Sequence, residues 1–347
     1  MIDLSSDTVT QPSVEMRRFM AEAPVGDEQK REDPSVNRLQ EMVADLTGKE
    51  AALYVPSGTM CNAIGVKLHT QPGDKIIVER SSHIYIAETG GPGLLAGVMT
   101  ALVEGERGVF TSEQVQAAML PNGSLNNAST PLVCLENTHN RGGGRVWPLA
   151  TFKAVTETAR SLGMTIHLDG ARLLNAVVAS KVPAAVWAAE VDTVWIDLSK
   201  GLGAPVGAVL AADSETIERA RRYKQMFGGA MRQAGIIAAG GIYALEQNVE
   251  RLAEDHEHAR LLARGLAGIP GIQLNPAEVE TNIVFFDVAR TGLTAEEFNE
   301  QMKAHGIRMA AGGYGSTLLR AVTHLDVSKL DVNRVLDLAA SVIRSAA

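Results

Sequence analysis

The feature that most constrains the fold is an alternation of strand and helix patterns that begins at residue 51 and continues to about residue 211. Short runs rich in apolar and β-branched residues alternate with segments whose apolar residues recur at helical spacing. The predicted strands are 52–55, 75–79, 98–103, 132–136, 165–168, 193–196 and 206–211, and the predicted helices are 59–69, 113–120 and 149–162. This alternation is typical of an α/β fold with a mostly parallel sheet.

The remainder of the chain predicts a second, smaller unit. Segments 234–245 and 246–266 are expected to form one or two helices that leave the sheet domain. Beyond them, strand-like pieces at 281–288, 307–310 and 318–323 mix with amphipathic helices at 295–305 and 330–345. A length of 347 residues suits two domains. We therefore expect a large domain of residues 1–248, which includes the N-terminal arm, and a small C-terminal α+β domain of residues 249–347.

Composition and charge exclude several functional classes. The formal net charge is −8 and the basic residues are interspersed with acids, so nucleic acid is not an expected partner. The apolar stretches fall short of the roughly 20 residues of a membrane helix, so no membrane partner is expected either. The residues after Met1 show no signal-peptide pattern, and Cys61 and Cys134 are too few and too far apart for a disulfide framework or a zinc site. We expect a cytoplasmic protein without a metal cofactor.

Lys200 follows the predicted strand 193–196 in the sequence Leu198-Ser199-Lys200-Gly201. The glycines and the proline at 205 prevent a regular helix there, so the amine stands in a loop at the end of a buried strand. A lysine in such a place can form a Schiff base with a carbonyl compound. The alternative is an ordinary solvated lysine near a turn.

Three other strand ends carry polar candidates. Gly58 and Thr59 open a helix after strand 52–55, where exposed N–H groups could hold a phosphate; the alternative is a simple capped turn. His83 follows strand 75–79 and could equally be structural.

The remaining strand end holds a carboxylate. Asp169 ends strand 165–168 and needs a cationic partner; from the residues alone an ion pair with Arg172 is favoured, although a protonated pyridine nitrogen would serve equally well. Segment 136–140 ends a further strand. Since the carboxyl ends of parallel strands meet at one edge, we expect these groups to share a pocket.

On these residues the sequence resembles the threonine aldolases, pyridoxal-phosphate (PLP) enzymes of the β-eliminating lyase group. The resemblance runs nearly end to end. Its motifs are Asp3-Leu4, Ser6 to Thr10, Gly26-Asp27, Glu32-Asp33-Pro34, Ser57 to Met60, Glu136 to Asn140, Asp169 to Arg172, Leu198 to Gly201, Gly228-Gly229, Met231 to Gly235 and Arg320 to His324. It implies the aspartate-aminotransferase-like PLP fold and a PLP cofactor.

The resemblance also implies residue roles. Lys200 would bind PLP covalently, Asp169 would keep the pyridine nitrogen protonated and His83 would stack on the ring. Gly58 and Thr59 would hold the phosphate, with Arg232 reaching in from a neighbouring subunit. The residues implied to grip the substrate carboxylate are Ser6, Arg172 and Arg320, of which Arg172 would also contact the cofactor.

The implied reaction is cleavage of a β-hydroxy-α-amino acid, such as threonine, allo-threonine or phenylserine, to glycine and an aldehyde. The implied partners are this small substrate and a second copy of the chain, in a homodimer or homotetramer. Two other hypotheses stay open: a PLP-dependent transferase (transaldolase) or racemase, and a PLP-binding protein without turnover.

Four positions depart from the family pattern. Lys30 stands where the family has a tyrosine, Asn126 where it has a histidine, Ala87 where it often has a large ring and Gln225 where it has a lysine. These positions line the substrate and phosphate side in the family. The preferred substrate is therefore left open: Ala87 would leave room for a bulkier side chain, such as an aryl group, whereas Lys30 and Arg31 would instead favour an acidic one.

Overall fold

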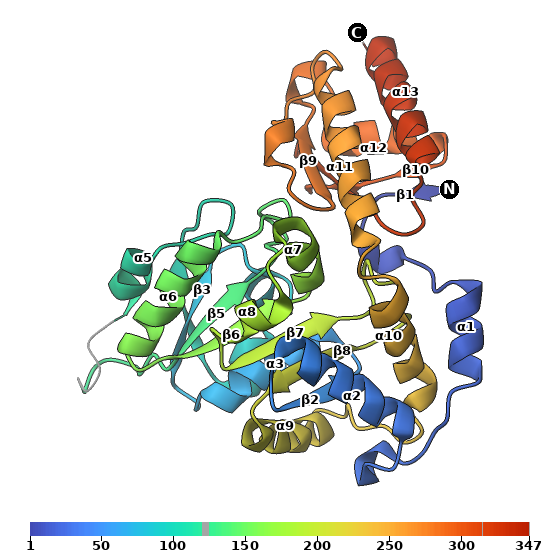
Figure 1. Cartoon of the computed structure of the whole chain (residues 1–347). Coiled ribbons are helices and arrows are strands. Elements are labelled where there is room, and N and C mark those ends of the chain that lie inside the picture. The colour runs from blue at the N-terminus through green and yellow to red at the C-terminus, as the bar shows by residue number, and fades with distance from the viewer. Residues whose placement is uncertain (120–124, 314, 347) are drawn as a thin grey trace.

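The computed structural model describes residues 1–119, 125–313 and 315–346. Its centre is a seven-stranded sheet with the strand order β2-β8-β7-β6-β5-β3-β4 (Figure 1). These strands are β2 (Ala51–Val55), β3 (Lys75–Glu79), β4 (Met99–Val103), β5 (Leu132–Glu136), β6 (Thr165–Gly170), β7 (Thr193–Asp197) and β8 (Ala208–Ala212). Within this sheet β8 runs opposite to the other six strands, so the expectation of a mostly parallel sheet is confirmed.

Helices cover both faces of this sheet because its strands are apolar on both sides. The helices of this part are α1 (Val14–Ala21), α2 (Pro34–Thr47), α3 (Gly58–His69), α4 (His83–Ile86), α5 (Ser112–Ala118), α6 (Leu149–Ser161), α7 (Leu173–Ser180), α8 (Ala184–Ala188), α9 (Ser214–Met226) and α10 (Gly235–Gln247). Along β7, Val194 and Ile196 pack with α2, α6 and α10, whereas Trp195 between them packs with α3 and α9. This alternation with period two is the pattern of a strand buried on both faces.

Helix α2 shows how closely local sequence rules place an element. Asp33 accepts a hydrogen bond from the Val36 N–H at 3.0 Å, Pro34 takes the first turn, and Gly48 ends the helix at a φ of 64°. Only glycine adopts that left-handed conformation without steric cost. Local sequence rules at these residues are enough to explain where the helix starts and ends.

The C-terminal part forms a second core. It contains α11 (Leu252–Ala267), α12 (Ala295–Ala304), α13 (Lys329–Ala346) and an antiparallel sheet of β9 (Ile283–Asp287), β11 (Ala310–Ala311) and β12 (Leu318–Val322). The predicted strand 307–310 is divided, since its first half, β10 (Ile307–Arg308), pairs instead with β1 (Ile2–Asp3). Ile2 and Leu4 therefore lie in this second core, although the sequence analysis grouped the N-terminal arm with the large domain.

Two further sequence predictions concern the helix at 113–120 and the absence of a membrane helix. The predicted helix 113–120 is α5, but residue 120 lies outside the described part of the chain. Among the described helices, none has both the length and the apolar character that crossing a membrane requires.

Candidate active site

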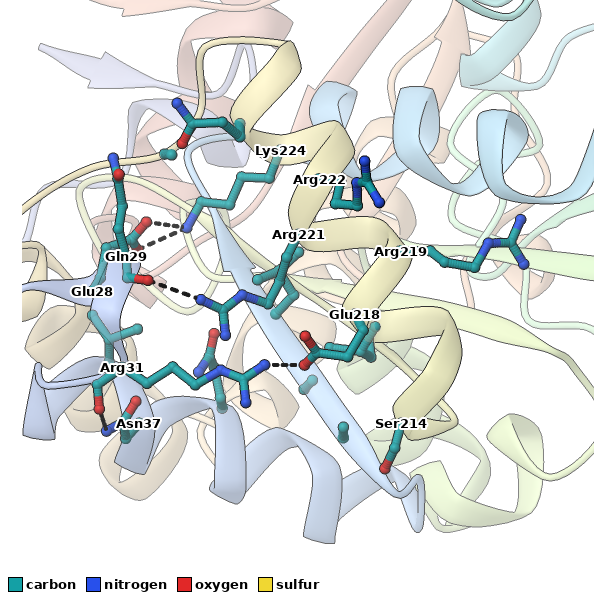
Figure 2. Close-up of a pocket in the computed structure, with 18 of the residues that line it drawn as sticks. Glu28, Gln29, Arg31, Asn37, Ser214, Glu218, Arg219, Arg221, Arg222 and Lys224 are labelled. Atoms are coloured by element: carbon teal, nitrogen blue, oxygen red, sulfur yellow. Dashed lines mark hydrogen bonds and ion pairs between the residues drawn. The ribbon is translucent and has the colours of Figure 1, made fainter.

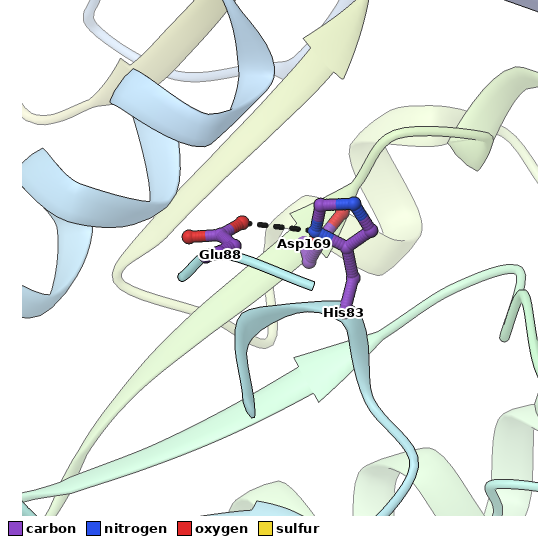
Figure 3. A group of neighbouring side chains, drawn as sticks. All are labelled: His83, Glu88 and Asp169. Carbon is purple, nitrogen blue, oxygen red and sulfur yellow. Dashed lines mark hydrogen bonds and ion pairs between the residues drawn. The ribbon is translucent and has the colours of Figure 1, made fainter. Parts of the chain in front are cut away.

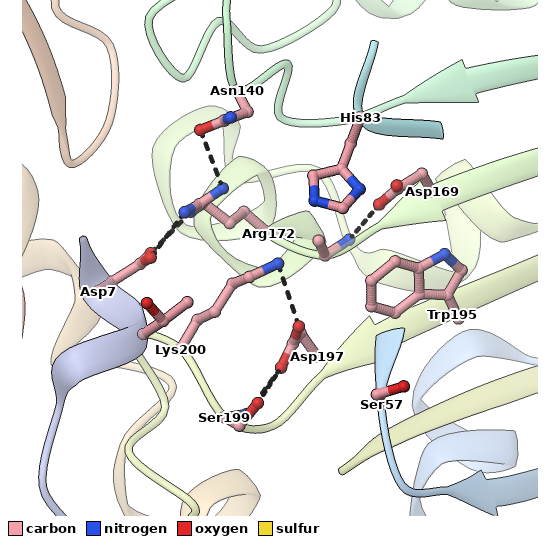
Figure 4. A network of polar contacts seen from close by, with 12 residues as sticks. Asp7, Ser57, His83, Asn140, Asp169, Arg172, Trp195, Asp197, Ser199 and Lys200 are labelled. Carbon is pink, nitrogen blue, oxygen red and sulfur yellow. Dashed lines mark hydrogen bonds and ion pairs between the residues drawn. The ribbon is translucent and has the colours of Figure 1, made fainter. Parts of the chain in front are cut away.

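The structure brings His83, Asp169 and Lys200 together where the carboxyl ends of the parallel strands meet (Figure 4). His83 begins α4 after β3, Asp169 lies near the end of β6, and Lys200 follows β7. Asp7 and Arg172 border the same cluster. Side chains from three of the predicted strand ends therefore lie close together.

Lys200 is held by the end of its own strand. Its Nζ lies 3.0 Å from Asp197 Oδ2 and 5.7 Å from the centroid of the Trp195 ring. Asp197 Oδ1 also accepts hydrogen bonds from the Ser199 N–H and hydroxyl, both at 2.8 Å. The carboxylate thus fixes the turn that carries the lysine.

Asp169 is buried, with 3% of its surface exposed. Its Oδ1 accepts the Ala171 N–H at 3.0 Å, and its Oδ2 accepts an Asn62 Nδ2–H at 2.8 Å. Burial and the nearby Glu136 carboxylate raise the pKa of Asp169 to about 6, against the smaller opposing effects of His83 and Lys200. A cationic partner such as a protonated ring nitrogen would stabilise its ionised form.

The ion pair between Asp169 and Arg172 favoured from the residues alone is wrong. Arg172 instead binds Asp7 in a bidentate pair, with Nε–Oδ2 and Nη2–Oδ1 distances of 2.6 Å. Both groups are buried. Asp7 comes from the N-terminal arm, 165 residues away, and this pairing leaves Asp169 free to face a ligand.

His83 is oriented by two carboxylates. Its Nδ1 lies 2.9 Å from Glu88 Oε1 (Figure 3), and its backbone N–H donates to Glu136 Oε2 at 2.7 Å. The hydrogen bond to Glu88 is the largest cause that raises the pKa of His83. One ring nitrogen of His83 and one carboxylate oxygen each of Glu88 and Asp169 lie within 4.8 Å of one another, so three polar groups converge on one small volume.

The expected phosphate cradle is an N-capped helix start. The Ser57 hydroxyl accepts the Met60 N–H at 3.3 Å, and Gly58 and Thr59 form the first turn of α3. A Cβ on Gly58 would lie 2.2 Å from an atom of the Trp195 ring, so glycine is required for α3 to approach β7. The structure thus shows the capped turn that was the alternative to a phosphate site, and the remaining N–H groups of this turn suit an anion.

The residues expected to bind the substrate carboxylate differ in how many of their hydrogen-bond donors already have partners. Arg320 donates to Asn140 Oδ1 at 3.0 Å and to the Ser5 carbonyl at 2.9 Å, while its buried Nε has no partner among the described residues. Ser6 caps the short 3-10 helix η1 (Asp7–Val9) and accepts the Thr8 N–H at 3.2 Å. The Nε and Nη2 of Arg172 already donate hydrogen bonds to Asp7, whereas the Nε of Arg320 has no such partner among the described residues.

Arg232 and two of the departing positions lie elsewhere. The Arg232 side chain is 64% exposed and pairs with Asp27 at 3.1 Å. Lys30 and Gln225 line a cavity of about 1190 Å³ between α2, β2 and α9 (Figure 2). In this cavity Lys224 binds both oxygens of Glu28, at 2.6 and 2.7 Å. The described lining includes none of the predicted site residues.

The arrangement fits a PLP ring and its phosphate. An amine, an imidazole and a buried carboxylate that has no ion pair within 4 Å among the described residues converge beside a helix N-terminus. Arg172 and Arg320 both donate to Asn140 at the border of this cluster. Sequence analysis missed Glu88, Asn62 and Asp197. Asp197 could have been found, since it stands three residues before Lys200; the other two carry no signal in a single sequence.

Known proteins are similar to this chain over most of its length. The β-eliminating lyase family model matches residues 3–289. A low-specificity L-threonine aldolase of Arabidopsis thaliana is 41% identical over 339 residues, covering 96% of this chain and 94% of that protein. A low specificity L-threonine aldolase of Escherichia coli K12 is 40% identical over 330 residues, covering 95% of each.

Solved structures show the same fold. A threonine aldolase of Leishmania major superposes with a TM-score of 0.84 at 18% identity, covering 99% of this chain and 100% of that one. A putative L-allo-threonine aldolase of Listeria monocytogenes gives a TM-score of 0.80 at 18% identity, covering 100% and 96%. The fold implied by the sequence resemblance is therefore confirmed.

Proposed function

The chain belongs to the β-eliminating lyase family, and from that premise we propose that it is a PLP-dependent aldolase, which cleaves a β-hydroxy-α-amino acid to glycine and an aldehyde. The observation that carries the proposal is the convergence of Lys200, Asp169 and His83 at three strand ends. The relatives' names support threonine or a related substrate. They give less support to a transferase or racemase.

When bound, PLP accepts the electron pair left on Cα as the Cα–Cβ bond breaks. Lys200 is the amine placed to hold the cofactor covalently, and the Asp197 carboxylate beside it keeps its side chain in the site. Asp169 is the carboxylate that would hold a proton on the ring nitrogen. Gly58 and Thr59, at the N-terminus of α3, would bind the phosphate.

His83 is the group placed to take the proton of the β-hydroxyl. Since its Nδ1 is bound to Glu88, its Nε2 remains available as an acceptor. Arg320 is the group proposed to bind the substrate carboxylate, and Asn140, which accepts a hydrogen bond from its Nη1, holds the guanidinium in place. Ser6 and the remaining N–H of Arg172 complete this end of the site.

The reaction is tested with both β-configurations of threonine, phenylserine and β-hydroxyaspartate. We expect glycine and the matching aldehyde in equal amounts from at least one of them without an added acceptor. Glycine formation that depends on an acceptor aldehyde would instead assign a transaldolase. Comparing phenylserine with β-hydroxyaspartate distinguishes the aryl preference suggested by Ala87 from the acidic preference suggested by Lys30.

We also propose a homodimer or homotetramer in the cytoplasm. The exposed Arg232 and the 49% exposed Ile236 at the start of α10 support an interface beside the site. The two buried free cysteines suit a reducing compartment. Analytical ultracentrifugation of wild type and Arg232→Ala tests the assembly, and a monomeric wild type with full activity would contradict it.

Replacing Glu88 by glutamine is expected to move the acidic limb of the kcat/KM profile to lower pH. Loss of the Glu88 carboxylate lowers the pKa of His83, and a base must be deprotonated to act, so the active form persists to lower pH. We also expect kcat to fall about 10- to 100-fold, because the ring loses its orienting charge. A profile measured from pH 5 to 9 checks this. An unchanged acidic limb would show that His83 is not the titrating base.

A further inference from the structure

Asn62 lies on α3, one turn after the phosphate cradle, and is fully buried. Its Nδ2 donates to Glu88 Oε1 at 2.6 Å and to Asp169 Oδ2 at 2.8 Å. Its Oδ1 lies 2.7 Å from Trp195 Nε1 and 3.0 Å from His167 Nε2. The amide therefore uses both of its N–H groups and both lone pairs in one place.

The orientation of this amide is fixed by chemistry. The Trp195 indole can only donate a hydrogen bond, so the Asn62 atom beside it must be the oxygen. The NH2 group then faces the two carboxylates, which accept. A flipped amide would set its NH2 against the indole N–H and its oxygen against two carboxylates, which is unfavourable on both sides.

A buried chain of hydrogen bonds begins at the Asn62 Oδ1 and stabilises this side chain. His167 Nδ1 lies 2.8 Å from the Thr193 hydroxyl, which lies 3.1 Å from His69 Nε2. Burial is the largest cause that lowers the pKa of His167, to about 3, so its ring is neutral and its Nε2–H donates to Asn62. The amide is thus tied to β6 and β7 and cannot follow the movement of a ligand.

The place that Asn62 occupies is electrostatically demanding. Asp169 and Glu88 are both buried, and a carboxylate oxygen of one lies within 4.8 Å of a carboxylate oxygen of the other. Two carboxylates so close in a dry site repel each other, and one takes up a proton unless hydrogen-bond donors stabilise the charged forms. The two N–H groups of Asn62 are donors directed at both of them.

We propose that Asn62 is a positioning residue that holds the Asp169 and Glu88 carboxylates in place as its hydrogen-bond acceptors. Through Asp169 it sets the affinity for the pyridine ring, and through Glu88 it sets the orientation of His83. Since Trp195 contacts both Asn62 and the Gly58 turn, the same amide also joins the ring-nitrogen partner to the phosphate cradle. This inference rests on the proposed PLP cofactor.

The test replaces Asn62 by leucine, which keeps the volume and removes the donors. PLP affinity of the cofactor-free protein is measured from pH 5 to 9 by equilibrium dialysis, together with thermal unfolding. The described titratable groups that interact with Asp169 are His83, Glu88, Glu136, His139, Lys200, Cys61 and Cys134, and all are kept.

We expect the dissociation constant for PLP at pH 7 to rise about 10-fold or more, as a hydrogen bond to a charged group is lost. We also expect the pH below which affinity falls to move upward by about one unit, because a carboxylate without its donor keeps its proton to higher pH. Asn62→Asp, which keeps the size and adds a third carboxylate, is expected to weaken binding more at pH 8 than at pH 5.

The matched control is Asn175→Leu, another buried asparagine bound to a histidine, 3.1 Å from His256 Nε2 and outside the site. It is expected to lower the unfolding temperature with PLP affinity unchanged. Asn62 variants that behave like this control would overturn the proposal and leave Asn62 a purely structural role. A wild type that binds PLP but cleaves no β-hydroxy-α-amino acid would instead refute the proposed reaction and leave the Asn62 measurement valid.

Discussion

Lys200→Ala is expected to lower kcat/KM for amino-acid cleavage by about 1000-fold or more, because the variant lacks the only described amine placed beside Asp169 and His83 at the strand ends. The fold should persist, since the lysine lies in a loop and its one ion pair is with Asp197, three residues earlier. Steady-state glycine release, with PLP in excess, measures the loss.

Chemical labelling locates the same residue independently of activity. Borohydride reduction of the PLP-loaded wild type, followed by peptide mapping, is expected to leave the pyridoxyl group on Lys200. The control variant is Lys224→Ala, which removes another buried lysine but one that pairs with Glu28 in a different cavity. Labelling that persists in Lys200→Ala, or a label on Lys224, would refute the site assignment.

Parts of this site were predictable because they follow from local rules. A strand followed by a Gly- and Ser-containing turn places Lys200, His83 and Asp169 at the same edge of a parallel sheet, whatever the rest of the chain does. The caps of α2 were likewise readable from Asp33 and Gly48 alone. Such features need only neighbours in the sequence.

The partners of these groups were not predictable because they come from distant segments. Arg172 was paired with Asp169, three residues away, on the assumption that a buried charge finds a nearby partner; its actual partner, Asp7, comes from the N-terminal arm. Asn62 lies inside an apolar helix and resembles a tolerated polar residue until β6 and β7 are packed against it. Long-range pairing of this kind depends on the tertiary fold, and a strand or helix pattern does not encode it.

Asp7→Asn is expected to lower the free energy of unfolding by about 3–5 kcal/mol, because it leaves the buried Arg172 guanidinium without a counter-charge. Asp7 also accepts an Asn282 Nδ2–H at 3.2 Å from the segment before β9, so one carboxylate links the arm, the start of α7 and the C-terminal part. Urea unfolding measures the change. The control, Glu104→Gln in an exposed pair with Arg80, should cost less than about 1 kcal/mol.

The same pair predicts how stability depends on pH. Burial alone would raise the pKa of Asp7, but the charge and hydrogen bonds of Arg172 hold it well below the ordinary carboxyl range. A lowered folded-state pKa stabilises the protein above the unfolded-state value of about 3.9, and this stabilisation is lost as pH falls below it. Asp7→Asn should therefore lose less stability than wild type between about pH 4 and pH 2.

Replacing both partners by apolar residues (Asp7→Leu with Arg172→Met) should restore part of the stability, because no buried charge remains unpaired. A loss in the double variant equal to the sum of the losses in Asp7→Leu and Arg172→Met would show that the pair contributes no coupling energy.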